Sequence, residues 1–518
     1  MDAVEVLVIG AGPTGLAMAA QLAALGVRVR VVDRALDRAH ESRALAIQPR
    51  TLEVLAGLGV TDQLVAEGNR AVRICLHAHN RQQAVPLFDL GLQDTPYPYL
   101  LMLSQAETER ILGERLAAAG VPVERGVELA GLDRTGDAPV ATLRHRDGRD
   151  EQLPTRFVVG CDGAHSTVRQ LTGIGFEGGT YPQTFVLADL EVDGVDSDAA
   201  HAFLAGQGML LLFPLGHPAT WRLLAMRPST DQTPPGVPLT LDEVQNLADN
   251  YTGATLRLHH PVWMTNFRLH HRAATRYRSG PVFLAGDAAH IHSPVGAQGM
   301  NSGIQDAVNL SWKISQALRG NTDPALLDSY EAERAPVGRM VLRFTDRAFT
   351  AATSTSPLAR FTRTRIAPVL MPAVLTPRRV RATAFRTMAQ LNIGYRHSPL
   401  SAQGPAAPRT GPRAGDRLPD APASGTTLHE LTAPPGWHLL LCGPPAAWPP
   451  GPIARLTRAR QVTVHRLTSA DDGPALHRLG LAPGMAGLCL VRPDGHIGYR
   501  SGGGDLTGLA VYLRRWLG

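Results

Sequence analysis

The chain has 518 residues, of which 44% are hydrophobic and 19% are charged, a composition ordinary for globular proteins. So long a chain exceeds one hydrophobic core and predicts several domains. The formal net charge of +6 comes almost wholly from arginine, since Lys313 is the only lysine. The densest basic run, 360–386, has no ladder of interleaved aromatic residues, so we expect no nucleic-acid binding.

The four cysteines, Cys75, Cys161, Cys442 and Cys489, are scattered and show no paired metal-binding spacing. No disulfide framework is expected in so long a chain, and a reducing cytoplasm is the expected location. The N-terminus has no signal-peptide pattern. No apolar run approaches the roughly 18 residues of a membrane span. We therefore expect a cytoplasmic protein that binds neither metal nor membrane.

The N-terminal stretch predicts a β-α-β unit. VEVLVIG (4–10) is a continuous apolar run, typical of a strand buried on both faces. PTGLAMAAQLAALG (13–26) has helical spacing and a terminal glycine, and VRVRVVD (27–33) is the next strand. Because only two residues separate the first strand from the helix, the turn between them is very short.

Further elements of the same kind follow along the chain. QAETERILGERLAAAG (105–120) predicts an amphipathic helix. RFVVGCDG (156–163) and GPVFLAGDAAH (280–290) predict buried strands that end in Gly/Asp turns. The short apolar runs of 176–275 are separated by turn residues, which predicts an inserted, largely antiparallel sheet. Residues 303–345 predict helix.

The C-terminal part of the chain predicts a separate small domain. Residues 357–394 predict helices broken by prolines, and 397–426 is a linker dense in Pro, Gly and Ala. A strand, a helix, a strand, a hairpin turning at Asp494-Gly495 and a closing helix then predict a thioredoxin-like fold. Cys442 begins CGPP, in which Pro445 stands where a thioredoxin motif has its second cysteine. We therefore expect no dithiol chemistry and a structural role for this domain.

The sequence GAGPTG (10–15) has the glycine spacing of a dinucleotide-binding fingerprint. Gly10 would allow the tight turn, Gly12 the approach of a pyrophosphate to the backbone, and Gly15 close packing of helix on strand. Asp33 ends the second strand, where an acid can bind ribose hydroxyls and disfavours a 2′-phosphate. A tight turn without ligand is the alternative interpretation. The fingerprint and Asp33 do not decide between NAD(P) and FAD.

The stretch GDAAHIHSPVGAQGMNSG (286–303) is rich in glycine and has a single carboxylate, Asp287, and no obvious nucleophile. A helix is expected to start near Gly299, with Ile304, Val308 and Ile314 in the core. His290 and His292 are spaced by one residue in a glycine loop, and we expect no acidic partner near them. We expect these two histidines to pack or hydrogen-bond locally and not to bind metal.

Three segments together resemble the flavoprotein aromatic hydroxylases, the single-component FAD monooxygenases of the p-hydroxybenzoate hydroxylase type. They are SRALAIQPRTLEVL (42–55), CDGAHSTVR (161–169) and GDAAHIHSPVGAQGMNSGIQDAVNL (286–310). The resemblance covers residues 1 to about 395, and the C-terminal domain matches the larger members, which act on phenols and polycyclic polyketides. It implies an α/β fold in five parts. These are a Rossmann-like FAD-binding domain in two parts (1–175 and 276–396), an antiparallel substrate domain (176–275), a linker (397–426) and a thioredoxin-like domain (427–518).

The resemblance also implies roles for individual residues. Arg43 matches an arginine near the pyrophosphate, and Gln105 and Asp287 match residues on the ribityl chain. Asp162 matches an acid linked to both FAD and the nicotinamide cofactor, and Pro294 a proline that faces the substrate. The expected cofactor-binding residues are Gly10, Gly12, Pro13, Thr14, Gly15, Asp33, Arg43, Gln105, Asp162, Asp287, Gly299, Met300 and Asn301, with Phe213 and Pro294 at the substrate.

Several of these positions also have an ordinary structural interpretation. Arg43 could pair with Glu41 or Glu53 at the surface, and Gln105 could be a polar residue at the start of a helix. Asp162 could cap a turn. Pro294 could stiffen its loop. In the inserted sheet, Pro214, Trp221, Met226 and Trp263 could line an apolar pocket together with Phe213, or could simply be core.

The resemblance implies that NADPH or NADH reduces FAD, that O₂ adds at the flavin C4a, and that the hydroperoxide oxygenates an aromatic substrate, as in antibiotic biosynthesis. The cofactor carries the difficult step, which explains a site without a nucleophile. No catalytic base is identified, and a monomer or homodimer is expected. Baeyer–Villiger oxygenation of a polyketide and a non-enzymatic flavoprotein are the alternatives. A flavin-dependent halogenase is disfavoured because the N-terminal part has no lysine.

Overall fold

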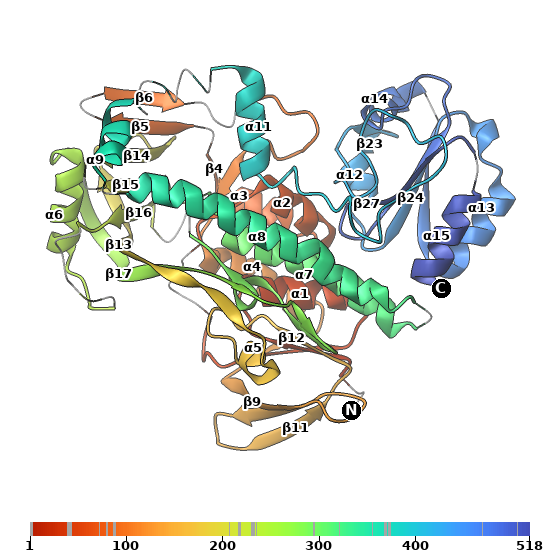
Figure 1. Cartoon of the computed structure of the whole chain (residues 1–518), viewed down its shortest axis with the longest axis horizontal. Coiled ribbons are helices and arrows are strands. Elements are labelled where there is room, and N and C mark those ends of the chain that lie inside the picture. The colour runs from red at the N-terminus through yellow and green to blue at the C-terminus, as the bar shows by residue number, and fades with distance from the viewer. Residues whose placement is uncertain are drawn as a thin grey trace.

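The structure is a computed structural model. It describes residues 4–38, 44–71, 73–78, 81–85, 90–206, 208–215, 219–228, 234, 236–293, 296–320, 322–354, 356–366, 370, 374, 376–468, 470–504 and 506–518. Figure 1 shows an α/β body in the centre, a large antiparallel sheet at one end and the C-terminal domain at the other. The long helix α8 (Ala325–Thr353) runs across the body from beside the C-terminal domain to the large sheet.

A six-stranded sheet forms the body, in the order β18-β19-β12-β1-β2-β8, and is parallel except for β18. The strands are β1 (Val6–Ile9), β2 (Val29–Asp33), β8 (Val123–Arg125), β12 (Phe157–Gly160), β18 (Arg278–Ser279) and β19 (Val282–Leu284). Carboxyl ends of parallel strands lie at one edge of a sheet, where ligands of such folds bind. The ends of β1, β2, β12 and β19 therefore bring the fingerprint, Asp33, Asp162 and Asp287 to the same edge.

Helices cover the parallel sheet. Helix α1 (Pro13–Ala24) packs on α7 (Gly299–Leu318), and both contribute to the main hydrophobic core. The predicted helix at 303–345 is two helices, because α7 begins at Gly299, ends at Leu318 and is followed by α8. The other helices of the body are α2 (Pro49–Leu55), η1 (Ala56–Leu58), α3 (Thr61–Glu67), α4 (Gln105–Ala118) and α5 (Thr167–Thr172).

Two small sheets complete the body. One has the order β3-β7-β4 and the other β11-β10-β9. Their strands are β3 (Ala46–Ile47), β4 (Asn69–Ala71), β7 (Leu100–Met102), β9 (Val127–Asp133), β10 (Val140–His145) and β11 (Asp150–Pro154). Strand β3 lies within the segment SRALAIQPR (42–50), which the resemblance to flavoprotein hydroxylases includes. The sheet that contains β3 and β7 is therefore expected to lie near the predicted site.

The large sheet has eight strands in the order β20-β17-β13-β16-β15-β14-β5-β6 and is antiparallel except between β14 and β5. Its strands are β5 (Ile74–Ala78), β6 (Arg81–Val85), β13 (Phe176–Asp193), β14 (Ala200–Ala205), β15 (Gly208–Pro214), β16 (Trp221–Met226), β17 (Arg257–Ala274) and β20 (His290–Ile291). The predicted antiparallel sheet of 176–275 is confirmed. Strands β5, β6 and β20 join it from outside that range.

The two faces of the large sheet are covered differently. Helix α6 (Leu241–Thr252) packs its apolar residues on one face. The other face packs against the end of α8, where Phe349 is buried among sheet residues. The chain then continues through α9 (Pro357–Phe361), a π-helical turn (Thr362–Ile366) and α11 (Arg378–Met388).

The C-terminal domain has a five-stranded sheet in the order β21-β27-β26-β24-β25. The order β24, α13, β25, β26, β27, α15 confirms the thioredoxin-like prediction, and β26 and β27 form the predicted hairpin. The elements are β21 (Ala402–Gln403), β22 (Pro422–Ala423), β23 (Thr426–Thr427), α12 (Leu428–Leu431), β24 (Trp437–Cys442), η4 (Pro445–Ala447), α13 (Pro450–Thr457), η5 (Arg458–Arg460), β25 (Val462–Leu467), η6 (Ala470–Asp472), α14 (Gly473–Arg478), β26 (Gly487–Val491), β27 (Ile497–Gly502) and α15 (Thr507–Leu517). Strand β21 comes from the predicted linker and pairs with β27.

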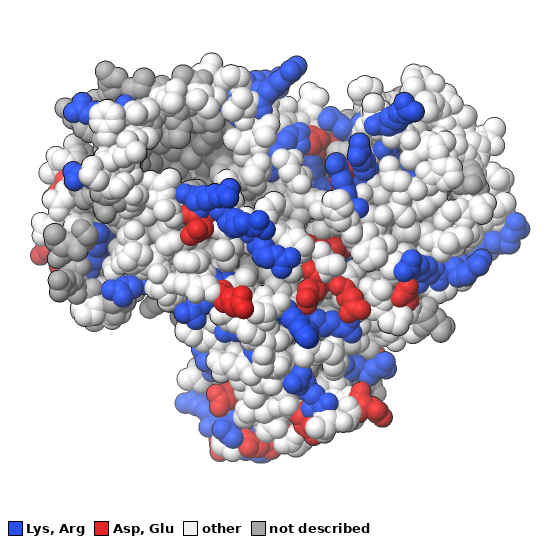
Figure 2. Space-filling view, viewed as in Figure 1, with Lys and Arg blue, Asp and Glu red and all other residues white. Residues whose placement is uncertain are grey.

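The folded chain has neither a single large basic patch on the face shown in Figure 2 nor, among the described residues, a membrane-spanning helix. Figure 2 shows basic side chains scattered over one face in separate groups, several of them next to acidic side chains. Among the residues that the structure describes, no helix is long and apolar enough to span a lipid bilayer.

Substitution of Gly15 by alanine should break the packing of α1 on β1. A Cβ atom at Gly15 would overlap the carbonyl oxygen of Gly10. We expect Gly15→Ala to lower the free energy of unfolding by about 1–3 kcal/mol, measured by urea denaturation. The control is Gly113→Ala in α4, where a Cβ meets no atom within 4 Å and where alanine stabilises a helix by about 0.5–1 kcal/mol. Equal effects of the two substitutions would contradict this packing.

Candidate functional site

The fingerprint loop has the geometry that the glycine spacing predicts. Gly10 has a positive φ of +99°, and a side chain there would overlap the backbone of Cys161. Gly15 lies so close to Gly10 that no side chain fits between α1 and β1. In contrast, a Cβ on Gly12 would meet no atom of the described residues within 4 Å. The loop is therefore crowded on its protein side and open at Gly12, as an approaching pyrophosphate requires.

Asp33 lies directly beneath this loop at the end of β2. Its Oδ2 accepts a 2.6 Å hydrogen bond from the backbone N–H of Ala11, and its Oδ1 accepts one from Ala35. The guanidinium of Arg125 lies 3.6 Å from the same carboxylate. These contacts fix Asp33 beside the fingerprint. Its contact with a ribose stays a prediction.

Asp162 follows β12 and makes the contacts of a helix cap. Its carboxylate accepts a 2.5 Å hydrogen bond from Ser166 Oγ and one from the backbone N–H of Val168, at the start of α5. Burial raises the pKa of Asp162, against the effect of the Ser166 hydrogen bond. The capping interpretation accounts for these contacts, and contact with FAD or a nicotinamide cofactor stays a prediction.

Asp287 has a distinctive position among its neighbours. It lies in a 3-10 turn (Gly286–Ala288, η2) after β19, in a stretch from 282 to 290 that is otherwise buried, and Asp287 itself is exposed. Arg169 holds this turn, since its Nη1 donates a 2.9 Å hydrogen bond to the carbonyl oxygen of Ala288. The chain thus presents one carboxylate at the sheet edge and buries everything around it.

Helix α7 begins at Gly299, as predicted, and Ile304, Val308 and Ile314 are buried. No described side chain caps the N-terminus of α7 or of α1. The two helices meet at Thr14, whose side chain would overlap a Cβ on either Gly286 or Gly303. Two uncapped helix N-termini, each with free N–H groups and a positive dipole end, are therefore held side by side at this edge.

The remaining predicted site residues differ in their positions and contacts. Pro13 and Met300 lie in the first turns of α1 and α7 and are partly buried. Asn301 is fully buried and bonds the backbone of Ala46 and Gln48, which ties α7 to β3. Gln105 accepts a hydrogen bond from the N–H of Ala44. Arg43 and Pro294 lie outside the described residues, so their roles stay predictions.

The side chain of Asp306 organises the turn that carries Asp287. Asp306 is buried in α7 and accepts hydrogen bonds from Gly286 N–H (3.0 Å), His290 Nε2 (2.7 Å) and Arg334 Nε (2.6 Å). Burial acts to raise the pKa of Asp306, but Arg334 and His290 lower it below its usual range. The expectation that His290 has no acidic partner nearby is wrong, because the fold places Asp306 of α7 within hydrogen-bonding distance of the His290 ring. Both His290 and His292 make local contacts, as predicted, and their rings stack.

The large sheet approaches the same edge through a buried ion pair that the sequence did not reveal. Arg222 donates two 2.6 Å hydrogen bonds to Asp189 and a third, of 2.9 Å, to the carbonyl oxygen of Ala44. Trp263 Nε1 also donates to Asp189. Trp263 is therefore a hydrogen-bonding residue, whereas Trp221 and Met226 are buried in the sheet's core clusters.

Phe213 is half-buried in a cluster that joins the large sheet to the body. The cluster includes residues of β3, β7 and α11 and the partly buried Ala297 in the loop before α7. Phe213 is thus brought next to the predicted cofactor edge. Its contact with a substrate stays a prediction.

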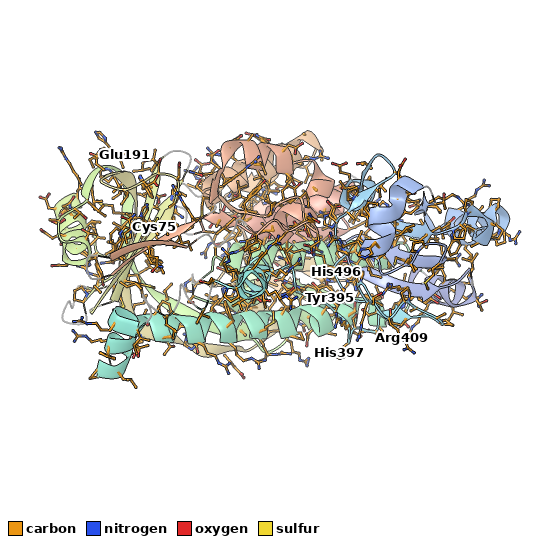
Figure 3. All side chains as sticks on the ribbon, turned by 90° about the horizontal axis from the view of Figure 1, so that it is seen from above. Cys75, Glu191, Tyr395, His397, Arg409 and His496 are labelled. Carbon is orange, nitrogen blue, oxygen red and sulfur yellow. The ribbon has the colours of Figure 1, made fainter. Side chains whose placement is uncertain are left out.

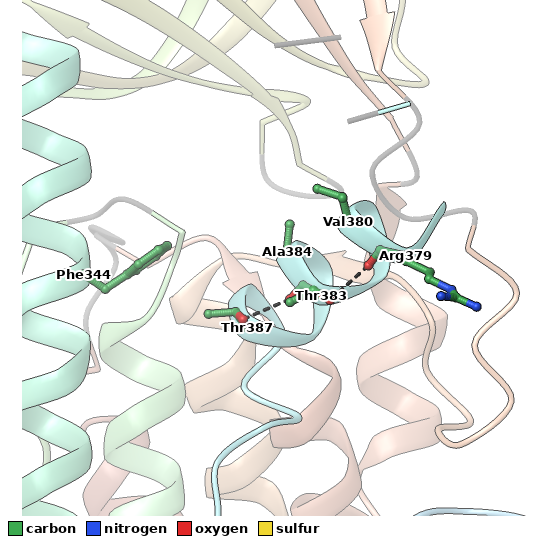
Figure 4. Close-up of a pocket in the computed structure, with 6 residues that line it drawn as sticks. All are labelled: Phe344, Arg379, Val380, Thr383, Ala384 and Thr387. Atoms are coloured by element: carbon green, nitrogen blue, oxygen red, sulfur yellow. Dashed lines mark hydrogen bonds between the residues drawn. The ribbon is translucent and has the colours of Figure 1, made fainter. Parts of the chain in front are cut away.

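A surface cavity of about 500 Å³, open to solvent and lined by exposed residues, lies between α8 and α11. Figure 4 shows Phe344 extending from α8 toward α11, which carries the other lining residues, Arg379, Val380, Thr383, Ala384 and Thr387. The hydroxyl groups of Thr383 and Thr387 donate to carbonyl oxygens of their own helix. The cavity therefore offers a ligand a mainly apolar surface with one guanidinium.

These features define a dinucleotide-binding α/β protein with an inserted antiparallel sheet. Residues 3–345 match the FAD binding domain family, and residues 411–518 match the C-terminal domain of aromatic-ring hydroxylases. The chain therefore belongs to the family of FAD-dependent aromatic-ring monooxygenases. The predicted fold, FAD as cofactor, and flavin-dependent aromatic monooxygenase activity are confirmed.

Relatives of known function match over nearly the whole chain. The 6-methylpretetramide 4-monooxygenase of Streptomyces rimosus is 39% identical and covers 98% of this chain and 93% of its own. The structure of the anhydrotetracycline hydroxylase OxyS, from the same species, has a TM-score of 0.80 at 29% identity, with 99% of each chain covered. CabE, an aromatic hydroxylase from angucycline biosynthesis, has a TM-score of 0.78 at 28% identity, covering 100% of this chain and 99% of its own.

Removal of Arg222 should strongly destabilise the protein. Asp189 and Arg222 are 3% and 0% exposed, so Arg222→Met leaves a buried carboxylate without its counter-charge. We expect the free energy of unfolding to fall by about 3–5 kcal/mol, measured by urea denaturation. The control Arg73→Met breaks an exposed pair with Asp196 and should cost at most about 1 kcal/mol. Similar losses for the two variants would contradict a stabilising role specific to Arg222.

Proposed function

We propose that the chain hydroxylates a polycyclic aromatic substrate that binds in the cavity between α8 and α11, with FAD at the adjacent sheet edge and NADPH or NADH as reductant. The observation that carries this proposal is that the loop before α7 is hydrogen-bonded to both walls of the cavity, α8 and α11. Ser293 Oγ donates to the carbonyl oxygen of Thr345, next to Phe344. Gln298 Nε2 donates to that of Met388, next to Thr387. Both walls are thus bonded to the loop that leads into α7.

The described residues fit FAD at this edge. The backbone at Gly12 and the first turn of α1 would hold the pyrophosphate. Asp33 would bind the ribose, and Asp287 would bind the ribityl chain. When bound, FAD supplies the redox chemistry that transfers electrons from NAD(P)H to O₂ and one oxygen atom to the ring. The N–H groups at the start of α7 would stabilise negative charge on the flavin ring by preorganised dipoles.

The size and chemistry of the cavity favour a fused-ring aromatic substrate. Its volume of about 500 Å³ lies within the range of about 300–1,000 Å³ for small-molecule sites. Phe344, Val380 and Ala384 offer apolar contacts, and Arg379 can bind a phenolate or carboxylate oxygen. The related tetracycline and angucycline enzymes support a polyketide-type substrate.

A substrate survey tests the proposed function. Purified protein reconstituted with FAD is assayed for NAD(P)H oxidation and O₂ uptake with fused-ring phenols and with simple phenols. We expect fused-ring phenols to stimulate both rates and to gain one oxygen atom, and NMR spectroscopy to place that atom as a ring hydroxyl. Stimulation by single-ring phenols alone would contradict the proposed substrate class.

Substitution of Asp287 tests the cofactor placement. Asp287→Asn removes the charged acceptor from the proposed ribityl site, and charged hydrogen bonds contribute about 1.5–3 kcal/mol. We expect the Kd for FAD to rise at least ten-fold, measured by the quenching of flavin fluorescence. The exposed Asp137 lies in the bend between β9 and β10, whose Arg134 bonds Ser279 beside the amino end of β19, and Asp137→Asn should leave the Kd unchanged. An unchanged Kd in Asp287→Asn would contradict the placement.

Filling the cavity tests the substrate placement. Ala384→Phe places a ring in the space between α11 and Phe344. We expect the KM for a fused-ring substrate to rise at least ten-fold while FAD binding stays unchanged, measured by steady-state kinetics and flavin fluorescence. The control Ala117→Phe adds the same ring to the exposed face of α4 and should alter neither quantity. An unchanged KM in Ala384→Phe would place the substrate elsewhere.

A further inference from the structure

Buried polar contacts continue from Asp306 toward the C-terminal domain. Arg334, on α8, is 1% exposed and donates to Asp306. Its Nη2 donates to the carbonyl oxygen of Ser302, in the first turn of α7 (3.1 Å), and its Nη1 donates to the hydroxyl of Tyr395 (2.9 Å). One guanidinium thus joins the start of α7, the carboxylate behind the Asp287 turn, and Tyr395.

Tyr395 in turn contacts the hairpin between β26 and β27. The centroids of the Tyr395 and His496 rings lie 4.3 Å apart. The guanidinium carbon of Arg492 lies 5.4 Å from the centroid of the Tyr395 ring. Figure 3 shows Tyr395 and His496 side by side where the blue C-terminal domain meets the body. The chain of contacts therefore crosses from the body into the C-terminal domain.

A second route joins the same hairpin to the middle of α7. Arg492 donates two hydrogen bonds to Glu333, of 2.7 and 2.8 Å, and two to Asp494, of 3.1 and 2.5 Å. Glu333 also accepts from Lys313 Nζ (2.7 Å) and Asn309 Nδ2 (2.7 Å), both on α7. Asn309 and Trp312 reach Asp494 directly. Every charged side chain of this route is at most 3% exposed.

The charges of the two routes balance within the buried region. Three acids, Asp306, Glu333 and Asp494, meet three bases, Lys313, Arg334 and Arg492. Buried charges tolerate few alternative arrangements, because each lost contact leaves an unpaired group away from water. The hairpin therefore restrains both the axial position of α7 and the turn that Asp306 holds. These are the two elements that present free N–H groups and the Asp287 carboxylate to the cofactor edge.

We propose that Tyr395, Arg492 and Asp494 are positioning residues for the flavin site. Through them the C-terminal hairpin fixes the start of α7 and the turn of residues 286–290. None of the three touches the cofactor edge, so they act through Arg334, Asp306 and Glu333. This inference rests on the proposed placement of FAD at Asp287 and adds that the C-terminal domain is part of the site's support.

Two matched pairs of variants in the full-length chain test this inference. Tyr395→Phe removes only the hydroxyl that accepts from Arg334, and Tyr512→Phe removes a buried hydroxyl that donates to Leu400 outside the two routes. Asp494→Asn removes a charge of the hairpin, and Asp472→Asn removes a buried charge that accepts from Ser424 within the C-terminal domain. Two quantities are measured: hydrogen exchange of residues 286–293 and 296–303 in the apo-protein, and the Kd for FAD.

We expect Tyr395→Phe and Asp494→Asn to speed exchange in these segments and to raise the Kd for FAD at least five-fold. The controls should lower Tm by similar amounts while leaving exchange in these segments and the Kd within two-fold of the unsubstituted protein. If Asp494→Asn does not fold, the tyrosine pair decides. Equal effects of Tyr395→Phe and Tyr512→Phe would overturn the inference, and so would faster exchange without weaker FAD binding. Failure of the FAD placement is seen separately, as an unchanged Kd in Asp287→Asn.

Discussion

At Thr14, three segments pack so closely that neither of the two glycines facing its side chain could gain a Cβ atom. Helix α1 carries Thr14, the turn after β19 carries Gly286, and α7 carries Gly303; a Cβ on either glycine would overlap the threonine side chain. This steric constraint sets two helix N-termini side by side at the carboxyl edge of the parallel sheet. No described side chain caps either helix N-terminus, so an anionic dinucleotide bound at this edge would meet both dipole ends.

Three buried arginines hold the segments around that edge. Arg222 of the large sheet donates to the carbonyl oxygen of Ala44, Arg169 of α5 to that of Ala288, and Arg334 of α8 to that of Ser302. Each guanidinium has donors left for other partners, Asp189 for Arg222 and Asp306 for Arg334. A planar group with five N–H donors can bond a carboxylate and a backbone carbonyl at once, which the single ammonium group of lysine does less well. The large sheet, α5 and α8 are thus each linked to the segments at this edge through a backbone oxygen.

Much of the fold and part of the site could be predicted from the sequence. Local rules, such as glycine spacing, helical periodicity and the Gly/Asp ends of strands, identified the fingerprint, the start of α7 near Gly299 and the turn at Asp287. The recruitment of β5 and β6 into the large sheet was missed, because strand pairing over such separations leaves no local pattern. Arg43 and Pro294 lie outside the described residues, so their predicted roles stay predictions.

The partners of buried polar residues could not be predicted from the sequence. Asp306 accepts a hydrogen bond from His290, which lies sixteen residues away in the sequence. Asp189 and Arg222 become neighbours only when their two strands pair in the large sheet. One signal was present: Ser302, Asp306, Asn309 and Lys313 recur at three- and four-residue spacing along a helix expected to be core. A polar stripe on a buried helix indicates a satisfied internal network, although its partners on α8 and in the C-terminal hairpin require the fold.

We propose that the edge shared by α1, the Asp287 turn and α7 holds the flavin cofactor. A crystal structure of the FAD complex tests it most directly. We expect the pyrophosphate against the backbone of Gly12, the Asp287 carboxylate within hydrogen-bonding distance of the ribityl hydroxyls, and the flavin ring at the first turn of α7. A pyrophosphate bound away from Gly12, or a flavin ring that does not meet the start of α7, would contradict it.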